Sequence, residues 1–272
     1  MSKRIISVFT VLFLILCMCS CGSGDKDKSL QKVLDKKRIV IGIDPAGGVM
    51  SSETGDGKFE GFSVECAKLC AKRLGLSAEF KAVSPEDLGQ ALDKGQIDCY
   101  WDYSSPDRQL KADYLFIPSG TVHHQVVIVN AADTKIKNIG SLKGQVVGVT
   151  ENSFSQKALE NAGVLYADLG EVKTFTTVES TLQALGSGQI AAAVADDNEV
   201  RRYITLRGDK TIKSVPGYIS TDNYYVGFLR SSVSLEEKIN SIIEGMLDDG
   251  TIKDLSMKWF SASAVAEKQN KS

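Results

Sequence analysis

Short apolar runs with strand character alternate with amphipathic helical segments along most of this chain. In the first half the expected strands cover residues 38–43, 78–83 and 97–101. Between them, Ser63 can begin a helix that Gly75 ends, and Ser84-Pro85 can begin another that Gly95 ends. Alternation of this kind is typical of α/β folds in which parallel strands are joined by helical crossovers. The pattern therefore predicts a parallel sheet covered by helices.

A short internal repeat indicates that this design occurs twice. Residues 90–97 match residues 183–190 at six of eight positions, with an offset of 93 residues. Each copy is a helix end, a glycine stop and the entry to an apolar strand, which favours two lobes of similar construction. The second half has expected strands at residues 146–150, 172–175 and 190–195. Its helices are expected to begin near Ser153, at Thr176 with Glu179 completing a capping box, and after Asp197.

The last third of the chain returns to a strand and then to helix. A strand is expected over residues 225–229, followed by a helix from Leu235 to Asp249. Ser234, with Glu237 three residues later, is the expected cap of this helix. Residues 263–272 are expected to form a polar tail outside the folded part.

The first 21 residues have the features of an export signal. Lys3 and Arg4 precede an apolar stretch of 15 residues, 5–19, which is short for a membrane span. Small residues precede Cys21, and this context resembles a bacterial lipoprotein signal in which that cysteine is acylated after cleavage. The alternative is a plain secretory peptide with incidental cysteines. Residues 22–36 are then expected to act as a tether between the lipid and the domain.

Composition excludes several classes of function. The formal net charge is −2 and the basic residues are dispersed, so we expect no nucleic-acid partner. With two histidines in the chain, a multi-histidine metal site is not expected, and no residue pattern indicates a cofactor. The remaining thiols, Cys66, Cys70 and Cys99, are expected to be small buried apolar residues and free.

Four segments in this order resemble the extracellular solute-binding proteins of family 3, the receptors of polar-amino-acid ABC importers. They are Gly57-Lys-Phe-Glu-Gly-Phe-Ser-Val-Glu65, Ser105-Pro-Asp-Arg108, Leu142-Lys-Gly-Gln-Val-Val-Gly-Val149, and Asp249-Gly-Thr followed by Lys258-Trp-Phe260. The resemblance implies an α/β fold of two Rossmann-like lobes joined by two crossover strands, as in type II periplasmic binding proteins. Lobe 1 would comprise residues 37–119 and 226–262, and lobe 2 residues 120–225. The two crossings, 118–121 and 221–225, are the candidate hinges.

The same resemblance assigns a binding residue to each end of a zwitterionic ligand. Arg108 matches the arginine that holds the ligand α-carboxylate, a role suited to its planar fork of donors. The alternative is a surface arginine in an early helical turn. Asp196 matches the acid that receives the α-ammonium, with Asp197 as the competing choice, although an aspartate here could also simply cap the next helix.

Further candidates come from the expected ends of strands and starts of helices. Ser153 begins a helix and could hold the carboxylate or serve as an ordinary cap, and Thr150 ends the preceding strand. Asp44 ends the first strand and could reach the ligand, and Ser105 belongs to the motif of Arg108. His123 and His124 follow the first crossing and are expected to divide between core and solvent, without a chemical role.

The chain also departs from the family pattern. Ala46-Gly-Gly-Val-Met50 and Pro85 stand where relatives carry the aromatic residues that clamp the ligand. We therefore expect Trp101, Tyr103 and Phe154 to supply aromatic walls from new positions, or Trp101 to be a core residue. If Asp102 joins Asp44 and Asp196 in facing the ligand, the negative charge favours a basic or amine-bearing solute.

The function that these observations favour is a non-enzymatic, lipid-anchored, extracytoplasmic receptor. It would be a monomer that delivers a small polar solute, an amino acid or a relative, to an ABC permease. One alternative is an enzyme on the same scaffold, because dehydratases of arogenate or prephenate look similar and could recruit Asp102 or Asp196. Another is a sensor that presents the closed lobes to a membrane receptor.

Overall fold

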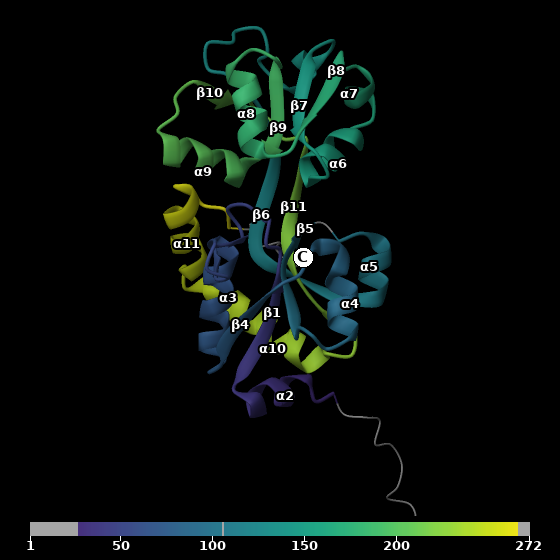
Figure 1. The fold of residues 1–272 in the computed structure, drawn as a ribbon, viewed down its shortest axis with the longest axis vertical. Coiled ribbons are helices and arrows are strands. Elements are labelled where there is room, and N and C mark those ends of the chain that lie inside the picture. Colours follow the sequence, from purple (N-terminus) through teal and green to yellow (C-terminus); the bar gives the residue numbers. More distant parts are fainter. Residues whose placement is uncertain (1–26, 105, 266–272) are drawn as a thin grey trace, which may run out of the picture.

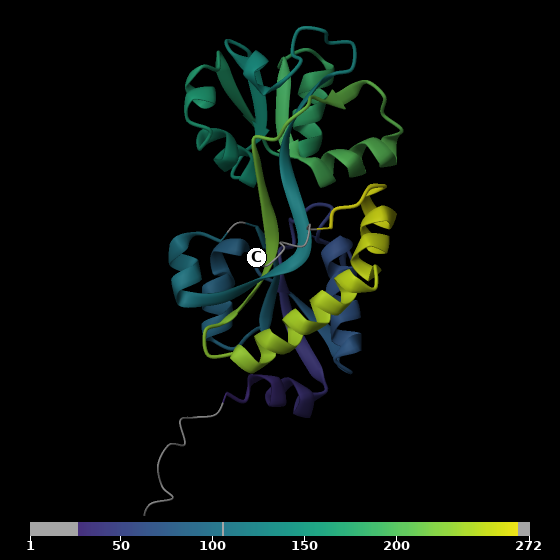
Figure 2. The same ribbon diagram turned by 180° about the vertical axis from the view of Figure 1, so that it is seen from behind.

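Two lobes lie one above the other along the long axis of the molecule, joined by two long strands (Figures 1 and 2). The structure is a computed structural model, and it describes residues 27–104 and 106–265. The joining strands are β6, Tyr114–Asn130, and β11, Ser220–Leu229. The expected pair of lobes is therefore present.

Lobe 1, the lower part of Figure 1, contains the first third of the described chain and its C-terminal helices. Its strands are β1 (Arg38–Ile43), β4 (Ser77–Ala82) and β5 (Cys99–Ser104), with the small hairpin β2 (Ser52–Glu53) and β3 (Phe59–Glu60). Its helices are α2 (Ser29–Lys36), α3 (Phe62–Arg73), α4 (Leu88–Asp93), α5 (Arg108–Asp113), α10 (Val233–Asp248) and α11 (Thr251–Phe260), with the 3-10 turn Pro85–Asp87.

Lobe 2 contains the middle of the chain. Its strands are β7 (Val146–Thr150), β8 (Glu171–Phe175), β9 (Ala192–Asp196) and β10 (Ile212–Ser214). Its helices are α6 (Phe154–Glu160), α7 (Val164–Ala167), α8 (Val178–Gly186) and α9 (Asp197–Arg207), with the 3-10 turn Ile139–Leu142. In Figures 1 and 2, α9 of lobe 2 lies beside α11 of lobe 1.

One nine-stranded sheet runs through both lobes, in the order β4-β1-β5-β11-β6-β9-β7-β8, with β10 on β6. The pairs β4/β1/β5 and β9/β7/β8 are parallel, as predicted, but β11 and β6 pair antiparallel with their neighbours. The sheet is therefore mixed. Because β5 runs with β6 toward lobe 2 while β9 runs against β6, the carboxyl ends of the parallel strands in the two lobes point toward each other.

The two copies of the internal repeat make the same packing contact, one in each lobe. A Cβ built on Gly42 of β1 would lie 2.6 Å from Cδ1 of Ile97, the last residue of the first copy. A Cβ built on Gly148 of β7 would lie 2.4 Å from Cδ1 of Ile190, the last residue of the second copy. Each lobe thus presses the isoleucine that enters a strand against a glycine of its first strand, where a larger residue would not fit.

Several element boundaries differ from the expected ones. The cap of α8 is Thr177 with Ser180, one residue after the expected Thr176 and Glu179. Helix α10 begins at Val233, and Ser234 does not cap it; its hydroxyl instead lies 3.1 Å from that of Ser29 in α2.

Both ends of the described chain are also more ordered than expected. Helix α2 covers the second half of the range 22–36 that was expected to be a tether, and its Val33 is fully buried. At the other end, Ala264 accepts a hydrogen bond from the Val122 amide, and Val265 pairs with Thr121. The range expected to be a polar tail therefore begins with residues held against β6.

The expectation for the thiols is confirmed. Cys66, Cys70 and Cys99 are buried and free, and burial raises the pKa of each, that of Cys70 to about 12. Among the described residues, no helix has the length and apolar character needed to cross a bilayer. The predicted signal and Cys21 lie outside the described residues.

Candidate functional site

The candidate site lies where the facing strand ends of the two lobes meet the long strands β6 and β11. Its centre is Asp196, which ends β9 and caps α9. Tyr224 of β11 donates a hydrogen bond to Asp196 Oδ2 at 3.0 Å, and in the sheet it lies opposite Ser104 of β5. Tyr224 therefore connects Asp196 in lobe 2 to the strand of lobe 1 that leads to Arg108.

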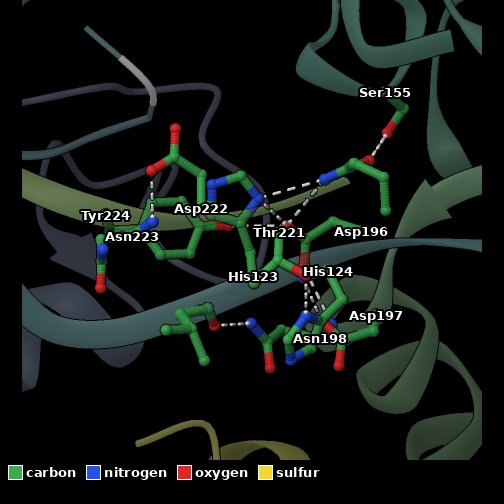
Figure 3. A network of polar contacts seen from close by, with 12 residues as sticks. His123, His124, Ser155, Asp196, Asp197, Asn198, Thr221, Asp222, Asn223 and Tyr224 are labelled. Atoms are coloured by element: carbon green, nitrogen blue, oxygen red, sulfur yellow. Dashed lines mark hydrogen bonds and ion pairs between the residues drawn. The ribbon is translucent and has the colours of Figure 1, made fainter. Parts of the chain in front are cut away.

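Asp196 is 7% exposed, and its carboxylate is held by several donors (Figure 3). Oδ1 accepts the Asn198 amide at 2.9 Å, which is the capping bond. Oδ2 accepts from Gln125 Nε2 at 3.4 Å, in addition to the tyrosine, and lies 3.3 Å from His123 Nδ1. The predicted acid is thus buried at the expected strand end, but part of its acceptor capacity is used within the protein.

His123 is a central member of this network, although sequence reasoning gave it no role. Its side chain is 1% exposed, and Nδ1 lies 3.1 Å from the Gln125 amide nitrogen. The ring contacts Phe154 edge-on, with ring centroids 4.8 Å apart, and Tyr224 at 4.6 Å. Ser155 completes the network by donating to Gln125 Oε1 at 2.5 Å. The two histidines divide as predicted, because His123 is buried while His124 is partly exposed.

Asp102 occupies an irregular position in β5. The pairing of β5 with β11 shifts register at this point, and Asp102 has a φ of 63°, which is uncommon for a residue with a side chain. Both carboxylate oxygens are buried without a hydrogen-bond partner among the described residues. Burial raises the pKa of Asp102 to about 7, and the nearby Ser119 hydroxyl and His123 oppose the shift.

Glu199 is a third acid near this site and was not predicted. Burial, together with the charge of Asp196, raises the pKa of Glu199 to about 8. The side chain comes from α9 of lobe 2 and lies against the loop that follows β1 in lobe 1. A Cβ built on Gly48 would lie 2.8 Å from Glu199 Oε1, and Gly48 has a φ of +61°. The spacing of three residues from Asp196 on one helix was the available sequence signal.

Asp197, the competing candidate, makes structural contacts. Its Oδ1 accepts the His124 amide at 3.0 Å, and its Oδ2 lies 3.4 Å from Arg201 one turn later in α9. Burial and the neighbouring Asp196 raise the pKa of Asp197, and the bond from His124 opposes this shift. Asp197 therefore joins α9 to β6.

Arg108 is the first residue of α5 and is exposed. Within the described ranges, no side chain forms an ion pair with its guanidinium. The start of α5 is fixed by Asp107, whose carboxylate accepts the Leu110 amide at 2.8 Å. No contact joins Arg108 to Asp196. Ser105, of the same motif, lies outside the described residues.

The expected aromatic walls have different environments. Trp101 is 2% exposed and belongs to the apolar core of lobe 1, which agrees with the alternative reading of this residue. Tyr103 is partly buried and packs on Tyr100 and Phe116, with centroids 6.0 and 5.8 Å away. Phe154, by contrast, lies against His123 in the network around Asp196.

The remaining candidates are engaged in local bonds. Ser153 accepts the Gln156 amide at 3.1 Å as the cap of α6 and donates to the Thr150 carbonyl at 2.6 Å. The Thr150 hydroxyl lies 3.4 Å from that of Thr181. Asp44 follows β1 and accepts the Ala46 amide at 2.8 Å; burial raises its pKa, and this bond opposes the rise. In the described parts of the chain, no group of three His, Cys, Asp or Glu side chains is placed to hold a metal ion.

The comparisons with known proteins agree with this architecture. The profile of the bacterial extracellular solute-binding proteins, family 3, matches residues 39–262. The chain belongs to this family.

Individual relatives are distant but similar in length. The chain is 27% identical to the L-cystine-binding protein TcyJ of Escherichia coli (strain K12) over 239 residues, which cover 87% of each protein. It is 25% identical to a polar amino acid ABC uptake transporter substrate binding protein from Streptococcus thermophilus, with a TM-score of 0.73 and coverage of 91% and 94%. An ancestral amino-acid-binding protein described as a precursor of cyclohexadienyl dehydratase shares the fold, at 22% identity and a TM-score of 0.69, with coverage of 85% and 99%.

Proposed function

We propose that the protein is the substrate-binding lipoprotein of an ABC importer and captures an amino acid, or a related amine-bearing zwitterion, between its lobes. The observation that carries the proposal is the buried carboxylate of Asp196 at the strand end of lobe 2, tied through Tyr224 to β5 of lobe 1. The family membership and the names of the amino-acid-binding and cystine-binding relatives support the same solute class.

In this proposal the two ends of the solute are held by different lobes. Arg108, exposed and without an ionic partner among the described side chains, is free to bind a carboxylate with two parallel hydrogen bonds. Asp196 receives the ammonium. Arg108 follows β5 by four residues, so it lies at the end of lobe 1 toward which β9 points. Phe154 and Tyr103 are the aromatic residues available near these groups.

We further propose that the lobes close on the solute by bending at the two crossings. Gly120, in the first crossing, has a φ of +90°, and a Cβ there would lie 2.7 Å from Ile252 of α11. The second crossing contains a register shift between Asn223 and Tyr225. Such irregularities interrupt the regular ladder, and hinges are commonly a few positions that absorb changes in φ and ψ.

The anchor and the partners belong to the same proposal. Acylation of Cys21 would hold the protein on the outer face of the membrane, where an ABC permease receives the solute. The segment between Cys21 and α2 is then a short tether. The protein acts as a monomer, because each chain carries both halves of the site.

Calorimetric titration with a panel of amino acids tests the proposed function. We expect saturable binding of at least one amino acid with a free carboxylate and ammonium, and weaker binding of its N-acetyl and amide derivatives. Absence of binding across the panel, together with mass spectrometry that detects no co-purified amine, would contradict the proposal.

A second function, an enzyme on the same scaffold, is favoured by one observation. Asp102 is a buried carboxyl whose pKa is raised to about 7, which is the range suited to proton transfer. The neighbour described as a precursor of cyclohexadienyl dehydratase is the comparison that supports this alternative. Incubation with prephenate and arogenate distinguishes the two functions, since only an enzyme releases carbon dioxide and an aromatic product.

A further inference from the structure

Three carboxyl groups, those of Asp102, Asp196 and Glu199, act electrostatically on Tyr224, and Asp196 also accepts its hydrogen bond. Burial raises the pKa of Tyr224 well above its ordinary value, and the charges of Asp196, Glu199 and Asp102 raise it further. The three acids come from different elements: Asp102 from β5, Asp196 from the end of β9, and Glu199 from α9. A single basic side chain, His123, contacts this group in the described part of the chain. The junction therefore holds three acidic groups beside one basic side chain, and the raised pKa values of Asp102 and Glu199 limit its negative charge at neutral pH.

The polar atoms that lack partners belong to the same junction. Both oxygens of Asp102 and Nε2 of His123 are buried without a hydrogen bond to any described residue. The Ser119 hydroxyl, which lowers the pKa of Asp102, lies 3.0 Å from the Thr121 hydroxyl and shares one hydrogen bond with it. Buried polar groups are rarely left unpaired, so a site with an orphan carboxylate and an orphan imidazole nitrogen indicates that something else completes it.

The charged and titratable groups that face His123 and Asp102 come from both lobes and from the strands that join them. Strand β5 supplies Asp102 itself and Tyr100, and α3 supplies Cys66. Asp196 and Glu199 come from β9 and α9, and Tyr224 comes from β11. From β6 come His123 and the neutral Ser119 and Gln125, and α6 adds the neutral Phe154 and Ser155. No lysine or arginine of the described ranges forms an ion pair with Asp102, Asp196 or Glu199.

We propose that Asp102, His123 and Asp196 form a proton-coupled site for the cationic group of the solute, in which the arriving cation takes the place of a proton. This inference rests on the proposed function. In the free protein, burial keeps a proton on the Asp102 carboxyl for a large part of the time at neutral pH. When an ammonium binds against Asp196, its positive charge favours the ionised form of the neighbouring carboxyl. The O–H bond of Asp102 then breaks, the proton leaves to water, and the ammonium keeps all of its own protons.

The cation does not have to touch Asp102. His123 contacts Asp196 at 3.3 Å and also acts electrostatically on Asp102, so one ring is coupled to both acids. The residues in the described chain are not arranged to hold a metal ion, so we infer an organic amine as the cation. Solutes with a net positive charge are therefore favoured over neutral and acidic ones.

The sign of the pH dependence follows from the exchange. Asp102 is protonated in the free protein below about pH 7, and it must lose that proton on binding. Ionisation of Asp102 should therefore raise the affinity about tenfold per pH unit as the pH approaches 7 and add no further dependence above it, where the pKa of Glu199, about 8, lies. Ordinary electrostatic attraction without proton exchange would give no such break in this range.

Titration calorimetry in two buffers with different ionisation enthalpies tests the inference. The probes are L-arginine, L-lysine and L-glutamine, added to the purified protein at pH 6.5 in phosphate and in Bis-Tris. The difference in heat should correspond to release of about 0.8 proton per bound L-arginine or L-lysine. Asp102→Asn, which cannot ionise, should release about 0.8 proton fewer than the wild type, and its affinity should rise less steeply between pH 6 and pH 7. Asp254→Asn, at an exposed acid of α11, is the matched control and should behave as the wild type.

The outcomes separate the inference from the function on which it rests. Binding of an amino acid without proton release, or proton release that Asp102→Asn does not reduce, overturns the inference and leaves the proposed function intact. Failure of every amino acid to bind overturns the proposed function and the inference together. Equal affinity for L-glutamine and L-arginine contradicts the preference for a cationic solute.

Discussion

Asp196 has two separable roles, capping α9 and carrying the charge that receives the solute, and two substitutions distinguish them. In Asp196→Asn the amide oxygen can still accept the Asn198 amide, because asparagine caps helices as well as aspartate does. It loses the negative charge, and an NH2 group replaces Oδ2, so Tyr224 and Gln125 lose their acceptor in this variant too. In Asp196→Ala the cap is lost, and the Tyr224 hydroxyl and the Gln125 amide lose their acceptor.

The magnitudes follow from these contacts. Loss of a cap costs about 1 kcal/mol and occurs only in Asp196→Ala. Burying donors without an acceptor costs roughly 1–3 kcal/mol, and this cost is common to both variants. Both variants remove the same repulsion from Glu199, so that effect cancels when they are compared. Asp196→Ala should therefore unfold with a free energy about 1 kcal/mol lower than Asp196→Asn, which is the contribution of the cap. Affinity for an amino acid should fall in both by about 3 kcal/mol, or roughly 100-fold, because each removes a buried charged partner.

Urea unfolding followed by circular dichroism measures the first difference, and titration calorimetry measures the second. Asp197→Asn is the matched control, since it retains an acceptor for the His124 amide and should bind with nearly wild-type affinity. If Asp196→Asn binds as tightly as the wild type while Asp197→Asn does not, the assignment of the two acids is reversed. If the alanine and asparagine variants are equally stable, the capping argument is wrong.

Three further perturbations have defined outcomes. Arg108→Ala should weaken amino-acid binding at least tenfold. Because the side chain is exposed, the unfolding free energy should change by less than about 0.5 kcal/mol. A loss of stability equal to the loss of affinity would contradict a role in binding. The pKa of Asp102 is about 7 in the folded protein and near 4 in the unfolded chain. The wild type should therefore lose stability relative to Asp102→Asn as the pH rises from 4 to 7, by up to about 1.4 kcal/mol per pH unit. Urea midpoints that shift in parallel for both proteins would refute this. The ring of Trp259 in α11 lies 5.0 Å from the Arg202 guanidinium of α9, so this contact joins the two lobes. Solute binding should therefore change the tryptophan emission, and Trp259→Phe should abolish the change. A change that survives in that variant would instead come from Trp101.

The sequence was sufficient to predict the features of the fold that depend on local residue patterns. The alternation of strands and helices predicted both lobes, and the repeat at residues 90–97 and 183–190 reappears as one packing contact in each. Asp196 was placed correctly at a strand end because an apolar run stops there. Local pattern was less reliable where similar residues are adjacent, as at Thr176 and Thr177, since either hydroxyl could cap α8.

The candidate site was harder to predict because its contacts join distant residues. His123 meets Asp196 from 73 positions away, and Tyr224 meets it from 28, so neither pairing has a sequence signature. Asp102 owes its burial to the irregular pairing of β5 with β11, and strand periodicity does not reveal such a shift. The order of α2 also depends on tertiary contacts, because Ser29 and Leu30 bond to Ser234 near the other end of the chain.

A crystal structure of the protein carrying its solute tests the central claim most directly. The account predicts an amino acid enclosed between the lobes, with its carboxylate on the Arg108 guanidinium and its ammonium against Asp196. A solute bound outside the junction of the lobes, or one that contacts neither of these side chains, would contradict it.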